Sequence, residues 1–376
     1  MRVVVVGAGL AGVKVAEGLR DGGFEGELVL LGAETELPYD RPPLTKQVLR
    51  REREPFFLLP VDHGFDLRLG VVVEGLDLAA RTVRTSVGEV AFDQLVIATG
   101  ADPRRLPGAP GHQLRTLAEC RSLADLLASG ARLGVVGAGL IGCEVAASAR
   151  TLDVEVHVVD VLAAPLVRVL GDTVAARLTE LHVARGVQFH LGTGVAEATA
   201  TSLTLSSGAV LEVDVVLEAM GVTPSVEWLG GSGLKVADGV ICDAVGLATE
   251  GVWAVGDCAR WADGTGGTVR HEHWTSATEQ AAIVAAEILG RSEPVVRVPY
   301  WWSDQYDVKL QGLGAFSAND DVEVLTVGRR QRPLALYSSS GHLTGAVGFS
   351  AGAALMGLRE AVVQSRSVED VRAQLA

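Results

Sequence analysis

Cysteine is scarce in this chain, with four residues among 376. Four thiols in a chain of this length do not form the disulfide framework of a small secreted domain. None of them stands in a C-x-x-C pair, which argues against a redox dithiol and a cysteine-rich zinc site. We expect two of them, Cys143 and Cys258, to be small buried packing residues.

Basic residues are also few, since Lys and Arg total 32 against 46 Asp and Glu, a net charge of −14. Binding to nucleic acid, or broadly to an anionic membrane, needs a surplus of positive charge, so we predict neither. No stretch reaches the roughly 18 apolar residues of a membrane span. The apolar N-terminus could pass for a signal peptide, but Lys14 and Glu17 interrupt it and no cleavage site follows. We therefore expect a cytoplasmic protein.

Glycine, by contrast, is abundant, with 45 residues, and one glycine pattern occurs twice. Residues 2–12 read RVVVVGAGLAG and residues 132–142 read RLGVVGAGLIG. In each copy a β-branched run precedes G-x-G-x-x-G and a helix-compatible segment follows. A second strand comes next, at Glu27–Leu31 and Val154–Val159. This is the βαβ arrangement of a dinucleotide-binding fold.

The three glycines of such a turn have separate functions. The first permits the tight turn, the second lets the backbone approach a pyrophosphate, and the third lets the helix pack closely on the strand. The pyrophosphate then lies against the free N–H groups at the helix N-terminus. The glycines concerned are Gly7, Gly9 and Gly12 in the first copy and Gly137, Gly139 and Gly142 in the second.

An acidic residue near the end of the second strand, about 20 residues after the glycines, is expected to bind a ribose. In the second copy it is Asp160, and no basic residue follows before Arg168. A carboxylate repels a 2′-phosphate, so we predict NADH over NADPH. In the first copy the candidate is Glu34, for which a solvated turn residue is the alternative. Two dinucleotide sites indicate two cofactors, and a flavin with a nicotinamide is the obvious pair because a hydride can pass between them.

The fold class predicted is α/β, with two Rossmann-like dinucleotide-binding domains and a smaller α+β C-terminal domain. Residues 101–111 and 221–224 are read as connections between domains. From about residue 297 short strands are expected, followed by a helical ending. The strand-like runs are Val71–Val73, Gln94–Thr99, Val213–Leu217, Val252–Val255, Val322–Val327 and Leu334–Tyr337, and the helical ending is Ala353–Ser365.

Several short motifs, taken in order along the chain, resemble a known family. They are PYDRPPLTK at residues 38–46, ATG at 98–100, the second glycine motif ending in Glu144, VGD at 255–257, HW at 273–274 and WSDQYD at 302–307. The chain is similar to the FAD-dependent pyridine-nucleotide reductases, and among them to the ferredoxin reductases of oxygenase systems. The resemblance implies FAD and NADH as cofactors.

The resemblance also implies domain boundaries and residue roles. It implies a discontinuous FAD-binding domain at residues 1–110 and 225–296, an NADH-binding domain at 111–224 and the C-terminal domain at 297–376. Lys46 should lie near flavin N5 and pair with Glu144, and these two are the expected catalytic residues. The other implied roles are Arg41 on the FAD diphosphate, Asp257 on the ribityl chain, Trp274 at the pyrimidine end of the flavin, Trp302 near its edge where electrons leave, and Thr99, Gly100 and Gly256 elsewhere in the FAD site.

Other branches of this superfamily pass electrons to cysteines in the helix after the first glycine motif or near residues 40–46. This chain has no cysteine before Cys120, so the electrons must leave the protein. We expect a small iron–sulfur ferredoxin as acceptor, [2Fe–2S] in type, that feeds an oxygenase. Two alternatives stay open: a flavoenzyme acting directly on a small metabolite or on oxygen, and a redox-sensing interaction protein resembling apoptosis-inducing factor.

Ferredoxins are usually acidic, so an acidic reductase needs a local basic patch for docking. The densest late cluster is Arg329, Arg330 and Arg332, with Arg297 and Lys309 in the same predicted domain. An ordinary solvated turn is the alternative for these arginines. We expect no metal site, because no third ligand accompanies His271 and His273. The oligomeric state is left open between a monomer and a weak dimer.

Overall fold

The computed structural model describes residues 1–59, 63–108, 110–127, 130–264, 266–291 and 297–375. The chain divides into two compact units, and the first comprises Met1–Asp40, Phe56–Asp102 and Val222–Arg297. The second comprises Arg41–Pro55, Pro103–Gly221 and Val298–Ala376. Residue 109 of a predicted connection and residues 296 and 376 at predicted domain ends lie outside the described residues. The division into three domains stays a prediction.

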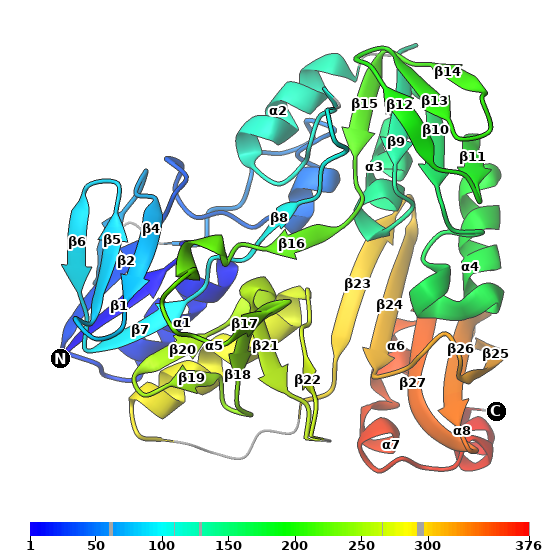
Figure 1. Cartoon of the computed structure of the whole chain (residues 1–376). Coiled ribbons are helices and arrows are strands. Elements are labelled where there is room, and N and C mark those ends of the chain that lie inside the picture. Colours follow the sequence, from blue (N-terminus) through cyan, green and yellow to red (C-terminus); the bar gives the residue numbers. More distant parts are fainter. Residues whose placement is uncertain (60–62, 109, 128–129, 265, 292–296, 376) are drawn as a thin grey trace. The chain divides into compact units, whose positions relative to one another are not determined.

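The first unit is built around a six-stranded sheet of order β19-β20-β7-β1-β2-β3, in which only β19 runs antiparallel to its neighbour (Figure 1). Val3 to Val6 of β1 are at most 2% exposed, as expected for a parallel strand covered on both faces. The elements of this layer are β1 (Arg2–Val6), α1 (Leu10–Asp21), β2 (Glu27–Leu31), β3 (Asp66–Arg68), β7 (Gln94–Ile97), β19 (Leu247–Thr249), β20 (Val252–Ala254) and α5 (Trp274–Ile288).

Smaller sheets complete the first unit. An antiparallel meander contains β4 (Val73–Asp77), β5 (Thr82–Thr85) and β6 (Gly88–Ala91). A four-stranded sheet contains β17 (Val236–Ala237), β18 (Gly239–Cys242), β21 (Ala259–Ala262) and β22 (Thr268–Val269). Two predicted connections form a two-stranded sheet of β8 (Ala101–Pro103) and β16 (Val222–Pro224). Short 3-10 turns occur at η2 (Glu227–Leu229) and η3 (Gly256–Cys258).

The second unit contains the other Rossmann-like layer, a parallel sheet of order β11-β10-β9-β15. Its elements are β9 (Arg132–Val136), α3 (Leu140–Arg150), β10 (Glu155–Asp160), α4 (Val167–Val183), β11 (Val187–Leu191) and β15 (Val215–Glu218). A small antiparallel sheet of β12 (Val195–Ala198), β13 (Ser202–Leu205) and β14 (Val210–Glu212) belongs to the same unit, as do η1 (Pro42–Thr45) and α2 (Leu117–Leu126).

An antiparallel sheet of order β23-β24-β27-β26-β25 follows, so β23 and β25 are its edge strands (Figure 1). The strands are β23 (Tyr300–Gln305), β24 (Val308–Gly314), β25 (Asp321–Val327), β26 (Arg332–Ser339) and β27 (His342–Phe349). The helices after them are α6 (Gly352–Met356), α7 (Arg359–Val363) and α8 (Val368–Leu375). The predicted α/β class with two Rossmann-like layers and an α+β C-terminal part is confirmed.

Two local predictions were wrong. The single helical ending at Ala353–Ser365 is split, because Gly357 ends α6 and α7 begins only at Arg359. Glycine stabilises a helix interior poorly, which explains the break. The strand expected at Val71–Val73 instead begins at Val73 and continues to Asp77. Its valines had suggested an apolar strand, whereas the observed one belongs to a partly exposed meander.

Candidate functional site

The first glycine turn follows β1 and is shaped by two of its glycines. Gly7 has φ of +109°, a conformation open to few residues other than glycine, and a Cβ there would overlap the carbonyl oxygen of Ala98. A Cβ on Gly12 would overlap the carbonyl oxygen of Gly7. These two glycines are therefore required by the fold itself, as the spacing predicts.

Gly9, the middle glycine, has no such packing reason. It is the N-cap of α1 with ordinary extended backbone, and a Cβ there would meet no described atom within 4 Å beyond its chain neighbours. The space that a Cβ on Gly9 would occupy, beside the first turn of α1, is therefore open. Free N–H groups and the helix dipole make such a position favourable for a phosphate. The residues present fit a dinucleotide whose pyrophosphate needs this space.

The second turn, in the second unit, repeats this geometry. Gly137 has φ of +110°, and a Cβ on it would overlap the carbonyl oxygen of Ala219. A Cβ on Gly142 would overlap the carbonyl oxygen of Gly137. Gly139, the N-cap of α3, again has no described atom within 4 Å of its ideal Cβ beyond its chain neighbours. Each unit thus carries one open cradle of the kind that a dinucleotide pyrophosphate occupies.

Asp160 ends β10 beside the second turn. Its carboxylate accepts hydrogen bonds from the N–H of Ala138 at 2.6 Å and from the N–H of Leu162 at 2.8 Å. Since Ala138 lies between the first two glycines, the acid is directly joined to the cradle. Each oxygen keeps a further lone pair, so a ribose hydroxyl can donate to it. Its role as the ribose ligand stays a prediction.

Glu34 follows β2 in the first unit, where it is half-buried. It accepts a hydrogen bond at 2.5 Å from the hydroxyl of Tyr39, which is buried. Glu34 is therefore held by the protein and is not simply a solvated turn residue. Its predicted contact with the FAD ribose is not tested by this geometry.

Other predicted FAD residues lie near the same helix N-terminus. Gly256 has φ of +74°, donates its N–H to the buried Gln280 at 2.7 Å, and would place a Cβ 3.0 Å from the Cβ of Ala11. Because Ala11 is in the first turn of α1, the turn that holds Asp257 packs beside the first cradle. The structure thus brings Asp257 and Gly9 into one region of the first unit.

Thr99 and Gly100 form the link after β7. The Thr99 hydroxyl donates to the carbonyl of Ser225 at 2.7 Å, and Gly100 has φ of +72°. Trp274 begins α5 and donates its indole N–H to Asp40 at 2.9 Å. This places the tryptophan against the end of the segment that precedes Arg41.

Lys46 and Glu144 form a buried ion pair in the second unit. The Lys46 Nζ lies 2.6 Å from the Glu144 Oε2, and both side chains are only 6% exposed. Lys46 also donates to the carbonyl of Pro42 at 3.0 Å. The pairing that the family resemblance implies is present, although 98 residues separate the two in the chain. The placement of this pair next to flavin N5 stays a prediction.

Two hydroxyl groups that our sequence analysis missed complete the surroundings of Glu144. Thr45 donates to its Oε2 at 2.5 Å, and Ser303 donates to its Oε1 at 2.7 Å. The carboxylate therefore accepts one ammonium and two hydroxyl donors while buried, which offsets its loss of hydration. Ser303 comes from β23, so the C-terminal sheet holds one side of this carboxylate.

Trp302 and Arg41 lie in the second unit as well. Trp302, on the edge strand β23, stacks with Tyr300 at a ring-centre distance of 6.2 Å, and the Lys309 Nζ lies 5.7 Å from its ring centre. Arg41 donates to the backbone carbonyl of Arg115. The predicted meeting of Arg41, Lys46 and Trp302 with first-unit residues around one flavin stays a prediction.

The cysteines are all free and buried. Burial raises the pKa of Cys120 to about 11, and burial is also the main cause of the raised pKa of Cys143, Cys242 and Cys258. They remain thiols at neutral pH, and a thiol is a weak nucleophile. Cys143 and Cys258 have the packing role that we expected.

The two histidines considered as metal ligands are stacked, with ring centres 6.0 Å apart. Burial lowers the pKa of His271 and lowers that of His273 to about 4, so both are neutral at pH 7. Within the part of the chain that the structure describes, no group of three or more His, Cys, Asp or Glu side chains could hold a metal ion.

One member of the predicted docking cluster belongs to a different compact unit from the others. Arg297 belongs to the first unit, where its guanidinium lies 4.7 Å from the ring centre of Trp261 and is half-buried. By contrast, Arg329 and Arg330 are exposed in the turn between β25 and β26. Sequence proximity had grouped Arg297 with them, but the sheet begins only at Tyr300.

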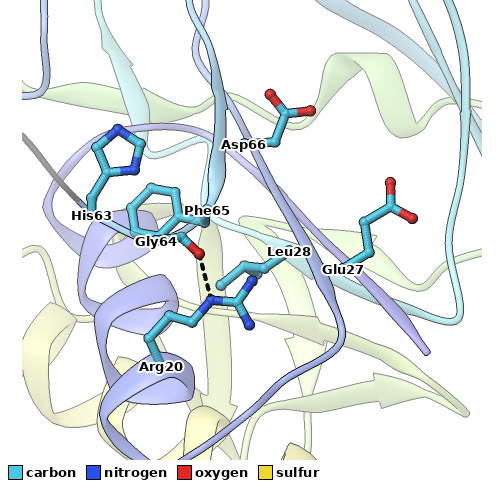
Figure 2. Close-up of a pocket in the computed structure, with 7 residues that line it drawn as sticks. All are labelled: Arg20, Glu27, Leu28, His63, Gly64, Phe65 and Asp66. Carbon is cyan, nitrogen blue, oxygen red and sulfur yellow. Dashed lines mark hydrogen bonds between the residues drawn. The ribbon is translucent and has the colours of Figure 1, made fainter.

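A hollow of about 460 Å³ in the first unit lies away from that unit's own glycine turn (Figure 2). It is lined by the amino end of β2 and by Arg20, which donates to the carbonyl of Gly64 at 2.7 Å. The glycine turn follows the carboxyl end of β1, and β1 and β2 are parallel. The hollow is therefore at the opposite end of the sheet from the predicted cofactor site.

Two known protein families match this chain. Residues 1–281 match the model of the pyridine nucleotide-disulphide oxidoreductase family, and residues 300–375 match the model described as the reductase C-terminal domain. In the part of the chain that is described, no helix has the length and apolar character to cross a membrane.

Individual relatives agree with these matches. Rhodocoxin reductase of Rhodococcus erythropolis is 38% identical over 85% of this chain and 79% of its own. The ferredoxin–NAD(+) reductase component of the p-cumate 2,3-dioxygenase system of Pseudomonas putida is 36% identical over 83% of this chain and 81% of its own. The covalent putidaredoxin reductase–putidaredoxin complex contains a chain with a TM-score of 0.91 and 29% identity, covering 100% of this chain and 98% of that one.

Proposed function

The chain belongs to the pyridine nucleotide-disulphide oxidoreductase family, in its ferredoxin reductase branch, and on this premise we propose that it transfers electrons from NADH through FAD to a small iron–sulfur ferredoxin that serves an oxygenase. The observation that carries the proposal is the pair of open cradles, one in each unit, at Gly9 and Gly139. They provide for two dinucleotides in one chain.

The cofactors supply the redox chemistry, and the protein binds and orients them. FAD, when bound, accepts a hydride from NADH and releases the electrons singly, as a one-electron carrier requires. The chain's own residues bind and orient. The N–H groups of the two helix N-termini bind pyrophosphates, and Asp160 offers an acceptor to a ribose hydroxyl while disfavouring a 2′-phosphate.

The Lys46–Glu144 pair supplies a fixed charge. A buried ammonium that is already oriented stabilises negative charge developing near it without reorganisation. Glu144 keeps that ammonium in one position, and Thr45 and Ser303 keep Glu144 in place. We propose that this cation faces the flavin, that Arg41 and Asp257 hold the diphosphate and ribityl parts, and that Trp274 and Trp302 flank the ring system.

The electron acceptor can be tested directly. Stopped-flow mixing with NADH should bleach the flavin absorbance, and cytochrome c should then be reduced only when a ferredoxin is present. When a panel of ferredoxins is compared, the partner is the one that supports the fastest reduction of cytochrome c. Full-rate NADH oxidation without ferredoxin would contradict the proposal and favour a direct flavin oxidase. A stable, slowly turning over complex with NADH would favour a redox sensor.

The compartment proposed is the cytoplasm. Support comes from the four free thiols, none of which is paired although all are described. Proteins that fold in oxidising compartments commonly pair their cysteines, whereas reducing conditions keep them free. Whether the chain acts as a monomer or a weak dimer stays open.

We predict that reversing the charge of Arg329 and Arg330 together to glutamate raises the KM for ferredoxin about tenfold at low salt. Both are exposed, and an acidic partner would lose attraction to this turn. Steady-state kinetics with varied ferredoxin measure the effect, with ferricyanide reduction as the check on the flavin. The matched control reverses two other exposed arginines, Arg53 and Arg177. An equal rise in KM for both variants would show that the effect comes from the net charge of the protein and not from a docking surface.

A further inference from the structure

Glu144 is the end of a row of polar side chains inside the second unit. Ser303 Oγ lies 2.7 Å from Glu144, and Gln305 Nε2 lies 3.0 Å from Ser303 Oγ. His182 Nε2 lies 2.7 Å from Gln305 Oε1, and the Tyr306 hydroxyl lies 3.1 Å from His182 Nδ1. Ser303, Gln305 and His182 are at most 1% exposed. Four successive hydrogen bonds thus connect Tyr306, in the turn after β23, with the carboxylate of Glu144.

These polar groups occupy positions where apolar residues would be expected. Ser303 and Gln305 lie on the buried face of β23, where they alternate with half-buried neighbours. His182 follows Val174 and Leu178 at four-residue intervals on the buried face of α4. Three polar side chains are therefore buried from two separate elements, and each is costly unless its hydrogen bonds are made.

The direction of every hydrogen bond follows from Glu144. A carboxylate paired with Lys46 can only accept, so Ser303 donates its proton to it. Ser303 then accepts from the Gln305 amide, whose oxygen accepts from His182 Nε2. Burial lowers the pKa of His182 to about 4, so the ring is neutral and its Nδ1 is an acceptor. The Tyr306 hydroxyl, kept protonated because burial raises its pKa, donates to that nitrogen.

The backbone at Tyr306 supplies an independent observation. It has φ of +58° in the two-residue turn between β23 and β24, where a bulky residue is strained and glycine is preferred. The ring packs on Arg185, whose guanidinium lies 4.6 Å from its centre. Arg185 in turn pairs with Asp307 at 2.6 Å. A tyrosine held in a strained turn by such contacts indicates a use for its side chain.

The row is unsuited to carrying protons. The Gln305 amide nitrogen has no lone pair available as an acceptor, so a proton arriving from Ser303 has no site there. A row in which every donor points the same way has another effect, because each bond polarises the next and strengthens the last one. The last acceptor is the Glu144 carboxylate.

We propose that Ser303, Gln305, His182 and Tyr306 are positioning residues, a one-directional row of donors that fixes the Glu144 carboxylate and, through it, the Lys46 ammonium. The proposal rests on the proposed function for what Lys46 does, but the row itself is a property of the chain. Its link to the buried ion pair is the hydrogen bond from Ser303 to Glu144.

The direction of the row can be tested by nitrogen NMR on the holoenzyme labelled with ¹⁵N-histidine. His182 should show a protonated Nε2 and an unprotonated Nδ1 at neutral pH. Tyr306→Phe keeps the ring on Arg185 and removes only the hydroxyl, so the Nδ1 signal should move to that of an unbonded nitrogen. Ser148→Ala removes a different buried hydroxyl, which donates to Thr45 carbonyl, and should leave the His182 signals unchanged. An Nδ1-protonated ring would overturn the proposal.

The effect on Glu144 is tested by the rate constant for flavin reduction by NADH. Ser303→Ala removes one donor to a charged acceptor and should lower this rate constant about tenfold, with the Kd for NADH changed less than about twofold. Ser303→Thr keeps a hydroxyl and should recover much of the rate. Tyr306→Phe, at the partly exposed end, should lower it about two- to threefold. Unchanged rate constants in both Ser303→Ala and Tyr306→Phe would overturn the proposal.

The two proposals fail differently. If the unmodified enzyme reduces no ferredoxin, the proposed function is wrong, while the histidine signals still report the row. If ferredoxin is reduced but the signals or the variant rates contradict the row, only the positioning role is wrong. Should Ser303→Ala not fold, Tyr306→Phe still decides the question, because it changes a side chain at a turn.

Discussion

Replacing Glu144 by alanine should lower the free energy of unfolding by about 3–5 kcal/mol, because it leaves the Lys46 ammonium buried without its counter-charge. Lys46 is 6% exposed and would keep only a carbonyl and a hydroxyl as partners. The same variant should reduce flavin about 10²-fold more slowly or worse, as expected when a preorganised charge is lost. Urea denaturation and stopped-flow absorbance measure the two effects.

A double variant separates stability from catalysis. Lys46→Met with Glu144→Gln removes both charges at similar volume and retains an amide for the neighbouring hydroxyls. Buried ion pairs replaced in this way often leave stability unchanged or improved. We therefore expect the double variant to unfold near the wild-type midpoint while flavin reduction stays slow. Wild-type rates in the double variant would show that the pair serves only the fold.

The second large effect is expected at Gly139. Gly139→Ala should weaken NADH binding by at least about 10²-fold while the melting temperature stays within a few degrees of wild type. The backbone there has φ of −77°, which alanine adopts, and its Cβ has no described atom within 4 Å beyond its chain neighbours. The added methyl group would occupy space that a pyrophosphate needs. Fluorescence titration with NADH and thermal unfolding measure the two quantities.

Gly142→Ala is the contrasting variant three residues away. Its Cβ would overlap the carbonyl oxygen of Gly137, so the helix must move off the turn. We expect this variant to lose stability as well as NADH binding, by an overpacking loss of about 1–3 kcal/mol. Normal NADH binding by Gly139→Ala would mean that the cradle is not the cofactor site. The matching change Gly9→Ala should reduce FAD retention by the same reasoning.

Local geometry explains what could be predicted from the sequence. The glycine turns could be predicted from spacing, because the β-branched run and the G-x-G-x-x-G pattern that follows it lie within a dozen residues of chain. The Lys46–Glu144 pair could not be predicted in that way. It joins residues 98 apart, and only the resemblance of whole motifs to a family suggested it. Loop 41–55 belongs to the second unit although the chain on both sides belongs to the first, and no local pattern indicates this.

The row of polar residues that ends at Glu144 has weak features in the sequence, which we did not interpret as a connected row. Serine and glutamine alternate with outward residues at positions 303 and 305 of an otherwise regular strand, and His182 continues an apolar stripe at helical spacing. Each feature alone is compatible with an isolated satisfied polar group. Only the three-dimensional structure shows that they contact one another. Arg297 was grouped with the C-terminal arginines from its place in the sequence, whereas the structure assigns it to the first unit.

The burial of the four cysteines affects how well the enzyme resists oxidation during turnover. An enzyme that releases electrons singly works beside oxygen, and stray electrons produce hydrogen peroxide next to the protein. Peroxide oxidises thiolates, and exposed residues of low pKa react first. All four thiols here are buried, and burial raises the pKa of each. The hydrogen peroxide that the enzyme produces therefore meets no exposed thiolate of low pKa on this chain. Repeated turnover in air should leave the thiols unoxidised.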